Sequence, residues 1–114
     1  MIECSPASVV LVRFPFSDLN ATKQRPAVVV SSVGFSTRHG DILLVPLTSV
    51  SQPDGGLQIS EWQAAGLLKP TWIKPMLATL SQSLITRFLG TLHVDDVPRV
   101  RAALAVMLAP SFCP

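Results

Sequence analysis

Short runs of valine, leucine and isoleucine, each closed by proline, glycine, serine or asparagine, constrain the fold of this chain more than any other feature. The first three are "SVVLVRF" (8–14), "PAVVVSS" (26–32) and "DILLVPL" (41–47). Runs of this length, rich in branched side chains and bounded by turn-forming residues, are typical of β-strands rather than helices. The chain is therefore predicted to begin as an antiparallel meander, with "VGFSTRHG" (33–40) as the hairpin connection between the second and third strands.

Three further strands are expected beyond residue 50. "GGLQIS" (55–60) follows a Pro-Asp-Gly-Gly turn signal, and "TRFLGTLHV" (86–94) is expected to bend at Gly90. Between them, "WIKPMLATL" (72–80) contains Pro75, which cannot donate a ladder hydrogen bond and so indicates an edge strand or a bulge.

The last segment has the periodicity of a helix. Asp95 or Asp96 can cap this helix, and Pro98 is tolerated in its first turn. The apolar residues that share one face are Val97, Val100, Ala103, Leu104, Met107 and Leu108. Short strands followed by one covering helix favour a mainly β fold, a small and strongly curved barrel with the helix packed against it. No repeat or linker interrupts the chain, so we expect a single domain over residues 1–114.

The composition excludes several classes of protein. With 48% hydrophobic and 14% charged residues, the chain is too apolar to be disordered. No stretch approaches the roughly 18 uninterrupted apolar residues of a membrane helix, and no basic region precedes an apolar one at the N-terminus. We therefore expect a soluble, cytoplasmic protein that does not bind membranes. The net charge of +2 is too small to indicate nucleic-acid binding by itself.

Soft metal ligands are few and scattered. Cys4 and Cys113 lie near opposite ends of the chain, and more than fifty residues separate His39 from His93. These positions fit no metal-ligand spacing, so neither a metal nor another cofactor is expected.

Polar and basic side chains gather where the strand runs begin and end. Loops between strands commonly carry functional groups. Arg25 stands directly before Pro26, which favours an extended backbone and places the guanidinium at the rim where the second strand begins. The third run ends in Thr48 and Ser49. If the second and third runs pair as a hairpin, Arg25 and Thr48 lie at the same end of the sheet.

These residues also have ordinary structural interpretations. Arg25 could form a surface ion pair with Asp18 or Asp41. The hydroxyls of Thr48 and Ser49 could bind nearby backbone in a turn at the end of the strand.

The aromatic residues admit two interpretations as well. Phe16 is expected to be exposed because it alternates with Phe14 and lies in the first loop, where it could stack on an unpaired base. Trp62 and Trp72 could line a nucleic-acid groove, a subunit contact or the core. His39 is expected in a solvated turn, with contact to RNA as the alternative.

Four segments of the chain resemble the MazF/PemK toxins of toxin–antitoxin systems. They are "VVLVRFPFSDLNATKQRPAVVVSS", "ILLVPLTS", "WQAAGLLKPTWIKP" and "FLGTLHVDDVPRVRAALAVML", which together cover about residues 8–108. The resemblance implies a small SH3-like barrel of the MazF/CcdB-like kind that dimerises and cuts single-stranded RNA without a metal. It implies 2′,3′-cyclic phosphate and 5′-hydroxyl products. It further implies that Arg25 and Thr48 are catalytic, with Ser49 as a helper.

Further expectations follow for RNA and partners. We expect Phe16, Asp18, Lys23 and Arg38 to contact RNA, with Lys23 and Arg38 holding phosphates. The resemblance implies a homodimer with messenger RNA as substrate and an acidic antitoxin that lies across the basic groove.

The chain departs from the family pattern in one place, and two other functions remain open. Members commonly carry Gly-Asp just before the first strand, where this chain has Ala7 and Ser8. One alternative is a non-catalytic RNA- or peptide-binding barrel. Another is a gyrase-poisoning toxin of the same fold, recognisable by a terminal Trp-Gly-Ile that is absent from "LAPSFCP" (108–114).

Overall fold

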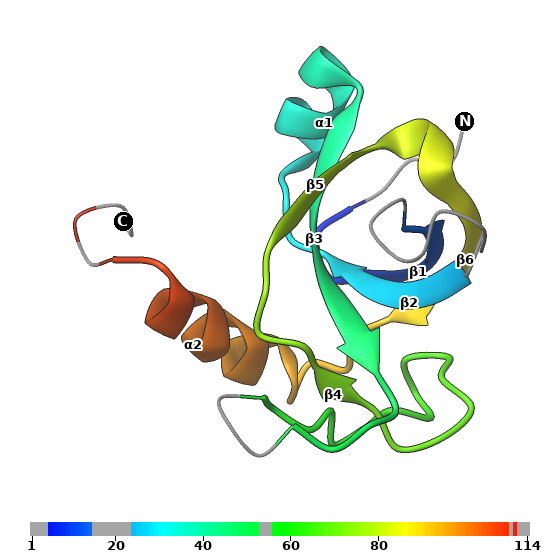
Figure 1. Cartoon of the computed structure of the whole chain (residues 1–114), viewed down its shortest axis with the longest axis vertical. Helices are drawn as coiled ribbons and strands as arrows, with labels where there is room; N and C mark the ends of the chain where they lie inside the picture. Colours follow the sequence, from blue (N-terminus) through cyan, green and yellow to red (C-terminus); the bar gives the residue numbers. More distant parts are fainter. Residues whose placement is uncertain (1–4, 15–23, 53–55, 110, 112–114) are drawn as a thin grey trace.

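The computed structural model describes residues 5–14, 24–52, 56–109 and 111. The strands are β1 (Ser8–Arg13), β2 (Gln24–Val29), β3 (Asp41–Thr48), β4 (Trp72–Ile73), β5 (Ala78–Ser81) and β6 (Ile85–Thr91). The helices are α1 (Val33–His39), the short 3-10 helix η1 (Gln82–Leu84) and α2 (Val97–Met107). The strands form one sheet in the order β4-β3-β2-β1-β6, and β5 also pairs with β3 (Figure 1).

The sheet is strongly curved. β3 is shared by three neighbours: β2 pairs with it on one edge, while β5 and β4 follow one another along the other edge. All of these pairings are antiparallel, as is the pairing of β1 with β2 and β6. In the part of the chain that the structure describes, β6 pairs with β1 alone. The barrel expected from the sequence is therefore present but is not closed.

The first three strands bury side chains on both of their faces. The inner cluster, inside the curve of the sheet, consists of Val10, Val12, Phe14, Ala27, Val29, Ile42, Leu44, Ala78 and Leu80. The helix-side cluster consists of Val9, Val28, Val45, Leu47, Ile59, Ala65, Leu67, Ile73, Leu92 and Val100. Because alternate residues of a strand point to opposite faces, a strand buried on both faces needs an unbroken apolar run. This explains the runs of valine and leucine in the sequence.

Helix α2 covers the helix-side cluster. Pro98 lies in its first turn, as expected. Val100 of the predicted apolar face belongs to that cluster, and four others of this face pack against it: Val97, Ala103, Leu104 and Met107. Leu108, the sixth, follows the helix and is 37% exposed. No helix among the described residues is long and apolar enough to cross a membrane.

Asp96 precedes α2 but does not cap it with its side chain. The carboxylate is fully buried and accepts hydrogen bonds from the backbone N–H groups of Ser60 (3.1 Å) and Glu61 (2.9 Å) and from the Arg99 guanidinium (2.9 Å). Burial acts to raise the pKa of Asp96, but the hydrogen bonds from Glu61, Ser60 and Arg99 outweigh it, and the pKa lies below its ordinary value. Asp96 therefore links the chain at Ser60 and Glu61 to helix α2.

The connection between β2 and β3 differs from the expected hairpin loop. It forms helix α1, whose N-cap Ser32 accepts a hydrogen bond from the backbone N–H of Phe35 at 3.1 Å. His39 is the last residue of this helix rather than a turn residue, and its ring lies 4.8 Å from that of Phe35. The two strands still pair antiparallel, because a short helix returns the chain as a turn does.

Two expected strands are shorter than predicted. The run at 55–60 contributes a single bridge, between Gln58 and Trp72. The run at 72–80 is divided into β4 and β5, and Pro75 lies in the gap between them. Pro75 was expected to mark an edge or a bulge, and instead it separates two strands because it cannot donate to the ladder.

Candidate functional site

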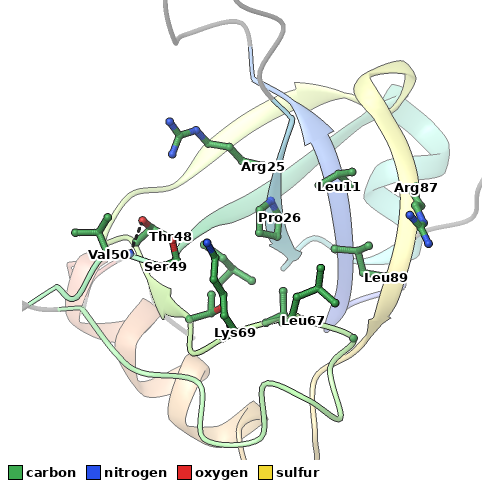
Figure 2. Close-up of a pocket in the computed structure, with 14 residues that line it drawn as sticks. Leu11, Arg25, Pro26, Thr48, Ser49, Val50, Leu67, Lys69, Arg87 and Leu89 are labelled. Carbon is green, nitrogen blue, oxygen red and sulfur yellow. Dashed lines mark hydrogen bonds between the residues drawn. The ribbon is translucent and has the colours of Figure 1, made fainter.

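An open pocket of about 380 Å³ lies at the end of the sheet where β2 begins and β3 ends (Figure 2). Arg25, Thr48 and Ser49 all line it. The structure thus brings together the three residues that were predicted to be catalytic.

The strand register explains why Arg25 and Thr48 meet. The pairing of β2 with β3 runs from Val29 and Leu44 to Ala27 and Pro46. Continuing the same antiparallel register by two residues places Arg25 opposite Thr48. The expectation that they share one end of the sheet is confirmed.

Thr48 is held in place by the turn that follows β3. Its Oγ1 accepts the backbone N–H of Val50 at 3.1 Å, the structural role considered for this hydroxyl from the sequence. A hydroxyl can accept and donate at the same time. The half-buried Thr48 can therefore keep this bond and still donate its proton to a ligand, while Ser49 beside it is exposed.

Arg25 is exposed on β2, and its charge is not neutralised by a described carboxylate. Among the described residues, Asp96 pairs with Arg99, and Asp95 lies 3.4 Å from the ring nitrogen of His93. Asp41 begins β3, at the opposite end from Thr48, so the pairing with Asp41 that the sequence allowed is wrong. Asp18 lies outside the described residues. Among the described residues, no carboxylate therefore competes with an anionic ligand for this guanidinium.

A tight turn and β6 build the opposite wall of the pocket. The turn ends at Gly66, which has a φ of 86°. The Leu67 N–H donates to the carbonyl of Trp62 at 3.0 Å and the Gly66 N–H to that of Gln63 at 3.1 Å, the pattern that ends a helical turn with a left-handed residue. A Cβ at Gly66 would lie 2.1 Å from the Leu89 carbonyl oxygen, so glycine permits a close approach to β6.

This wall carries two cations that the sequence reasoning missed, Lys69 and Arg87. The Lys69 side chain extends toward Thr48 and Ser49, whereas the Arg87 guanidinium points away from them (Figure 2). Lys69 precedes Pro70, just as Arg25 precedes Pro26. The cation-before-proline signal that identified Arg25 could have identified Lys69.

The remaining predicted RNA contacts are not placed at the pocket. Arg38 is exposed on α1, at the opposite end of β3 from Thr48 (Figure 1). Phe16, Asp18 and Lys23 lie outside the described residues. The proposed contacts of all four with RNA stay predictions.

The aromatic residues considered for RNA stacking serve other roles where they are described. Phe14 belongs to the inner cluster. Trp62 packs against the helix-side cluster, and Trp72 lies half-buried in β4. Neither tryptophan lines the pocket.

The described lining combines cations, hydroxyls and apolar side chains. It contains Arg25, Lys69, Arg87, Thr48, Ser49 and Thr71 together with five leucines, and it includes no carboxylate, imidazole or thiol. Guanidinium and ammonium groups beside hydroxyls are suited to bind phosphate oxygens. The arrangement can hold a phosphate and stabilise additional negative charge on it.

The sequence as a whole matches the model of one protein family, described as PemK-like, MazF-like toxin of type II toxin–antitoxin systems, over residues 5–108. The chain belongs to this family. The pocket described above is accordingly a feature of a PemK/MazF-like toxin. No match was found among curated proteins.

Solved structures of PemK/MazF-like toxins share the fold. An endoribonuclease in complex with its cognate antitoxin, from a mycobacterial species, is 18% identical over 94% of each chain, with a TM-score of 0.72. Toxin MazF-mt6 of Mycobacterium tuberculosis is 15% identical over 88% of this chain and 94% of its own, with a TM-score of 0.70. A MazE-MazF structure from Deinococcus radiodurans gives 16% identity, 93% and 96% coverage and a TM-score of 0.74. At such identities the likeness establishes the fold.

Proposed function

We propose that this PemK/MazF-like toxin is an endoribonuclease that cuts single-stranded RNA, with messenger RNA as its substrate. The observation that carries the proposal is that Arg25 and Thr48 line the same open pocket, at the end of the sheet where β2 begins and β3 ends. Structures of similar fold that are named endoribonucleases from mycobacterial species support it.

The residues suit a transesterification within RNA. The 2′-hydroxyl of the substrate is the nucleophile, so the enzyme must chiefly orient it and stabilise the dianionic phosphorane. Arg25 offers a bidentate fork to two phosphorane oxygens, and it acts through its charge because a guanidinium does not lose its proton in proteins. Thr48 donates to a non-bridging oxygen, and Ser49 assists. The products are a 2′,3′-cyclic phosphate and a 5′-hydroxyl.

The proposed cleavage needs no metal ion. Cationic side chains in the pocket supply the charge stabilisation that a divalent ion provides in two-metal nucleases. The ligands that hard cations prefer are carboxylates, and the described lining contains none.

The test is incubation of the purified protein with RNA in excess EDTA, followed by analysis of the ends of the products. Cleavage should persist and leave 5′-hydroxyl ends that a kinase labels directly. Products with 5′-phosphates, or loss of cleavage in EDTA, contradict the mechanism. Tight RNA binding without cleavage supports the non-catalytic binding barrel instead.

We also propose that the active form is a homodimer in which two subunits share the RNA groove. The family resemblance supports this, and exposed apolar side chains such as Phe88 on β6 (48% exposed) are available for a subunit contact. Sedimentation should give about twice the 12.2 kDa chain mass. A monomer that still cuts RNA contradicts the shared groove.

An acidic antitoxin is the proposed regulatory partner. A structure of similar fold was solved in complex with its cognate antitoxin, and the cationic pocket of this chain suits an acidic segment. Such an antitoxin should compete with RNA and lose affinity as salt is raised.

A further inference from the structure

The proposed cleavage leaves one proton unaccounted for. When the bond between phosphorus and the 5′-oxygen breaks, that oxygen leaves as an alkoxide unless it receives a proton. Arg25 does not supply it because its guanidinium keeps its protons in proteins. Thr48 is assigned to a non-bridging oxygen, and an alcohol is a much weaker acid than an ammonium group.

Within the described lining, three side chains carry a charge: Arg25, Arg87 and Lys69. Two of them are guanidinium groups. The ammonium of a lysine differs because it can give up a proton, and lysines serve as acids and bases in other active sites. Lys69 is therefore the described lining residue with a chemically transferable proton.

Lys69 is also well placed. It belongs to the wall opposite Arg25, and its side chain extends across the pocket toward Thr48 and Ser49 (Figure 2). An in-line displacement places the attacking and leaving oxygens on opposite sides of phosphorus. A phosphate held by Arg25 and Thr48 at one rim thus leaves room for the departing oxygen toward the other wall.

The backbone at Lys69 is restrained. The Thr71 hydroxyl donates to the Lys69 carbonyl at 2.8 Å, and the following Pro70 limits the rotation of the chain. Leu67, two residues earlier, is buried in the helix-side cluster. These contacts fix the point from which the flexible side chain reaches into the pocket.

We propose that Lys69 is the proton donor to the departing 5′-oxygen, a role that rests on the RNA-cleaving function proposed above. The 2′-oxygen attacks phosphorus and its proton passes to solvent. The bond from phosphorus to the 5′-oxygen breaks, and that oxygen takes a proton from the Lys69 ammonium, giving the 5′-hydroxyl. The neutral amine then regains a proton from solvent.

Replacing the leaving oxygen separates proton donation from charge stabilisation. A sulfur atom in place of the bridging 5′-oxygen departs as a thiolate and needs no proton. This substitution does not change the two non-bridging phosphate oxygens. The experiment compares single-turnover cleavage of two RNAs, one with oxygen and one with sulfur at the site that the parent cuts. The enzymes are the parent, Lys69→Met, Lys69→Arg and a charge-matched control, Arg101→Met, on the exposed face of α2 away from the pocket.

The expected result is a loss of about a hundredfold for Lys69→Met on the oxygen substrate, the scale of general acid catalysis, with the sulfur substrate cut within about threefold of the parent rate. Lys69→Arg should behave in the same way because it keeps the charge but not the transferable proton. Arg101→Met should match the parent on both substrates.

Three outcomes overturn the assignment. An equal loss of rate on both substrates means that Lys69 acts through its charge alone. Rates like the parent's on the oxygen substrate mean that Lys69 has no part in the reaction. If the parent protein cuts neither RNA, the proposed function itself is wrong. This failure differs from the first two because it is seen in the parent, without any variant.

Discussion

Two positions in this chain stand out at the level of single residues, the pocket rim and the residue just before β1. Arg25 and Thr48 are brought together by strand register, and the cation faces no described carboxylate. Ala7, just before β1, adopts a φ of 71°, in the left-handed region that glycine prefers. Arg25 and Thr48 are the residues proposed for the chemistry, whereas Ala7 is strained by its backbone.

Arg25→Ala should slow cleavage by roughly a hundredfold, about 3 kcal/mol, because it removes the fork that stabilises the phosphorane. The cleavage rate of Arg25→Lys should lie between the rates of Arg25→Ala and of the parent, since lysine keeps the charge without the bidentate geometry. Single-turnover rates at saturating enzyme measure both. Arg101→Ala is the control for loss of one positive charge, and cleavage by Arg25→Ala at the parent rate would exclude the catalytic role.

Ala7→Gly should stabilise the fold by up to about 1 kcal/mol. Pro6 and Ala7 occupy the centre of a turn closed by the Ser8 N–H and the Ser5 carbonyl at 3.1 Å, and a positive φ at the second central position is typical of a type II turn. Relief of left-handed strain should outweigh the added chain entropy of glycine. Urea unfolding measures the change.

Ala102→Gly is the matched control for Ala7→Gly. It makes the same substitution on the exposed face of α2, where glycine is unfavourable, and should destabilise by about 1 kcal/mol. Destabilisation by both variants would show that Ala7 is not strained.

At the scale of elements, the turn that ends at Gly66 and strand β6 form the far wall of the pocket together. The turn approaches β6 so closely that neither Gly66 nor Gly90 has space for a Cβ beside the facing backbone. β6 has a register shift against β1 between the pairs Val9–Gly90 and Val10–Phe88, at the bend that the sequence indicated. The bulge and the turn thus fit one another.

Gly66→Ala should destabilise the fold by about 2 kcal/mol or more. The new Cβ would meet the Leu89 carbonyl, and the φ of 86° adds left-handed strain. Gly34→Ala in α1 is the control. Apart from its chain neighbours and the backbone of its own helix, nothing lies within 4 Å of the Gly34 Cβ position, and alanine favours a helix, so this variant should be more stable by about 0.5–1 kcal/mol. Thermal and urea unfolding of both variants measure this, and an unchanged stability of Gly66→Ala would contradict the close approach.

At the scale of the whole molecule, Asp96 links helix α2 to the segment that leads into the pocket wall. Its carboxylate binds the backbone of Ser60 and Glu61 while Arg99 also contacts the Gln58 carbonyl at 3.0 Å and the Ser60 hydroxyl. Residues more than thirty positions apart are joined in this way. The link should therefore contribute to global stability.

Asp96→Asn should lower the free energy of unfolding at pH 7 by about 2 kcal/mol, because charged hydrogen bonds to a buried acceptor are lost. The pKa of Asp96 in the folded state lies below the ordinary 3.8, so its contribution is fully present above that pH and is lost as the pH falls toward the folded-state pKa. The difference between parent and variant should therefore shrink below about pH 4.

Urea unfolding at several pH values between 7 and 3 measures that difference. Asp95→Asn is the control, since the Asp95 side chain is 74% exposed and should change stability little at any pH. A difference between parent and Asp96→Asn that is constant over this range would show that the carboxylate is not favoured by its buried contacts.

The sequence by itself determined the three main strands, the apolar face of α2 and the end of the sheet at which Arg25 meets Thr48. These features depend on residue spacing along the chain. Runs of branched residues favour strands, and antiparallel pairing of neighbouring strands determines which strand ends lie together. Helix α1 was missed because Val33 and Gly34 are poor helix formers, although Ser32 caps it. The strand expected at 55–60 was reduced to one bridge because its backbone is used in contacts with residues distant in sequence.

Only the tertiary structure decided the far wall of the pocket. Lys69 and Arg87 are distant in sequence from Arg25 and Thr48, and no local pattern says which turn will pack beside which strand. Their position follows from the curvature of the sheet, from the close approach at Gly66 and from the anchoring of the preceding segment by Asp96. Each of these is a contact between segments far apart in the chain, and such contacts depend on how the whole core packs rather than on the preferences of any one segment.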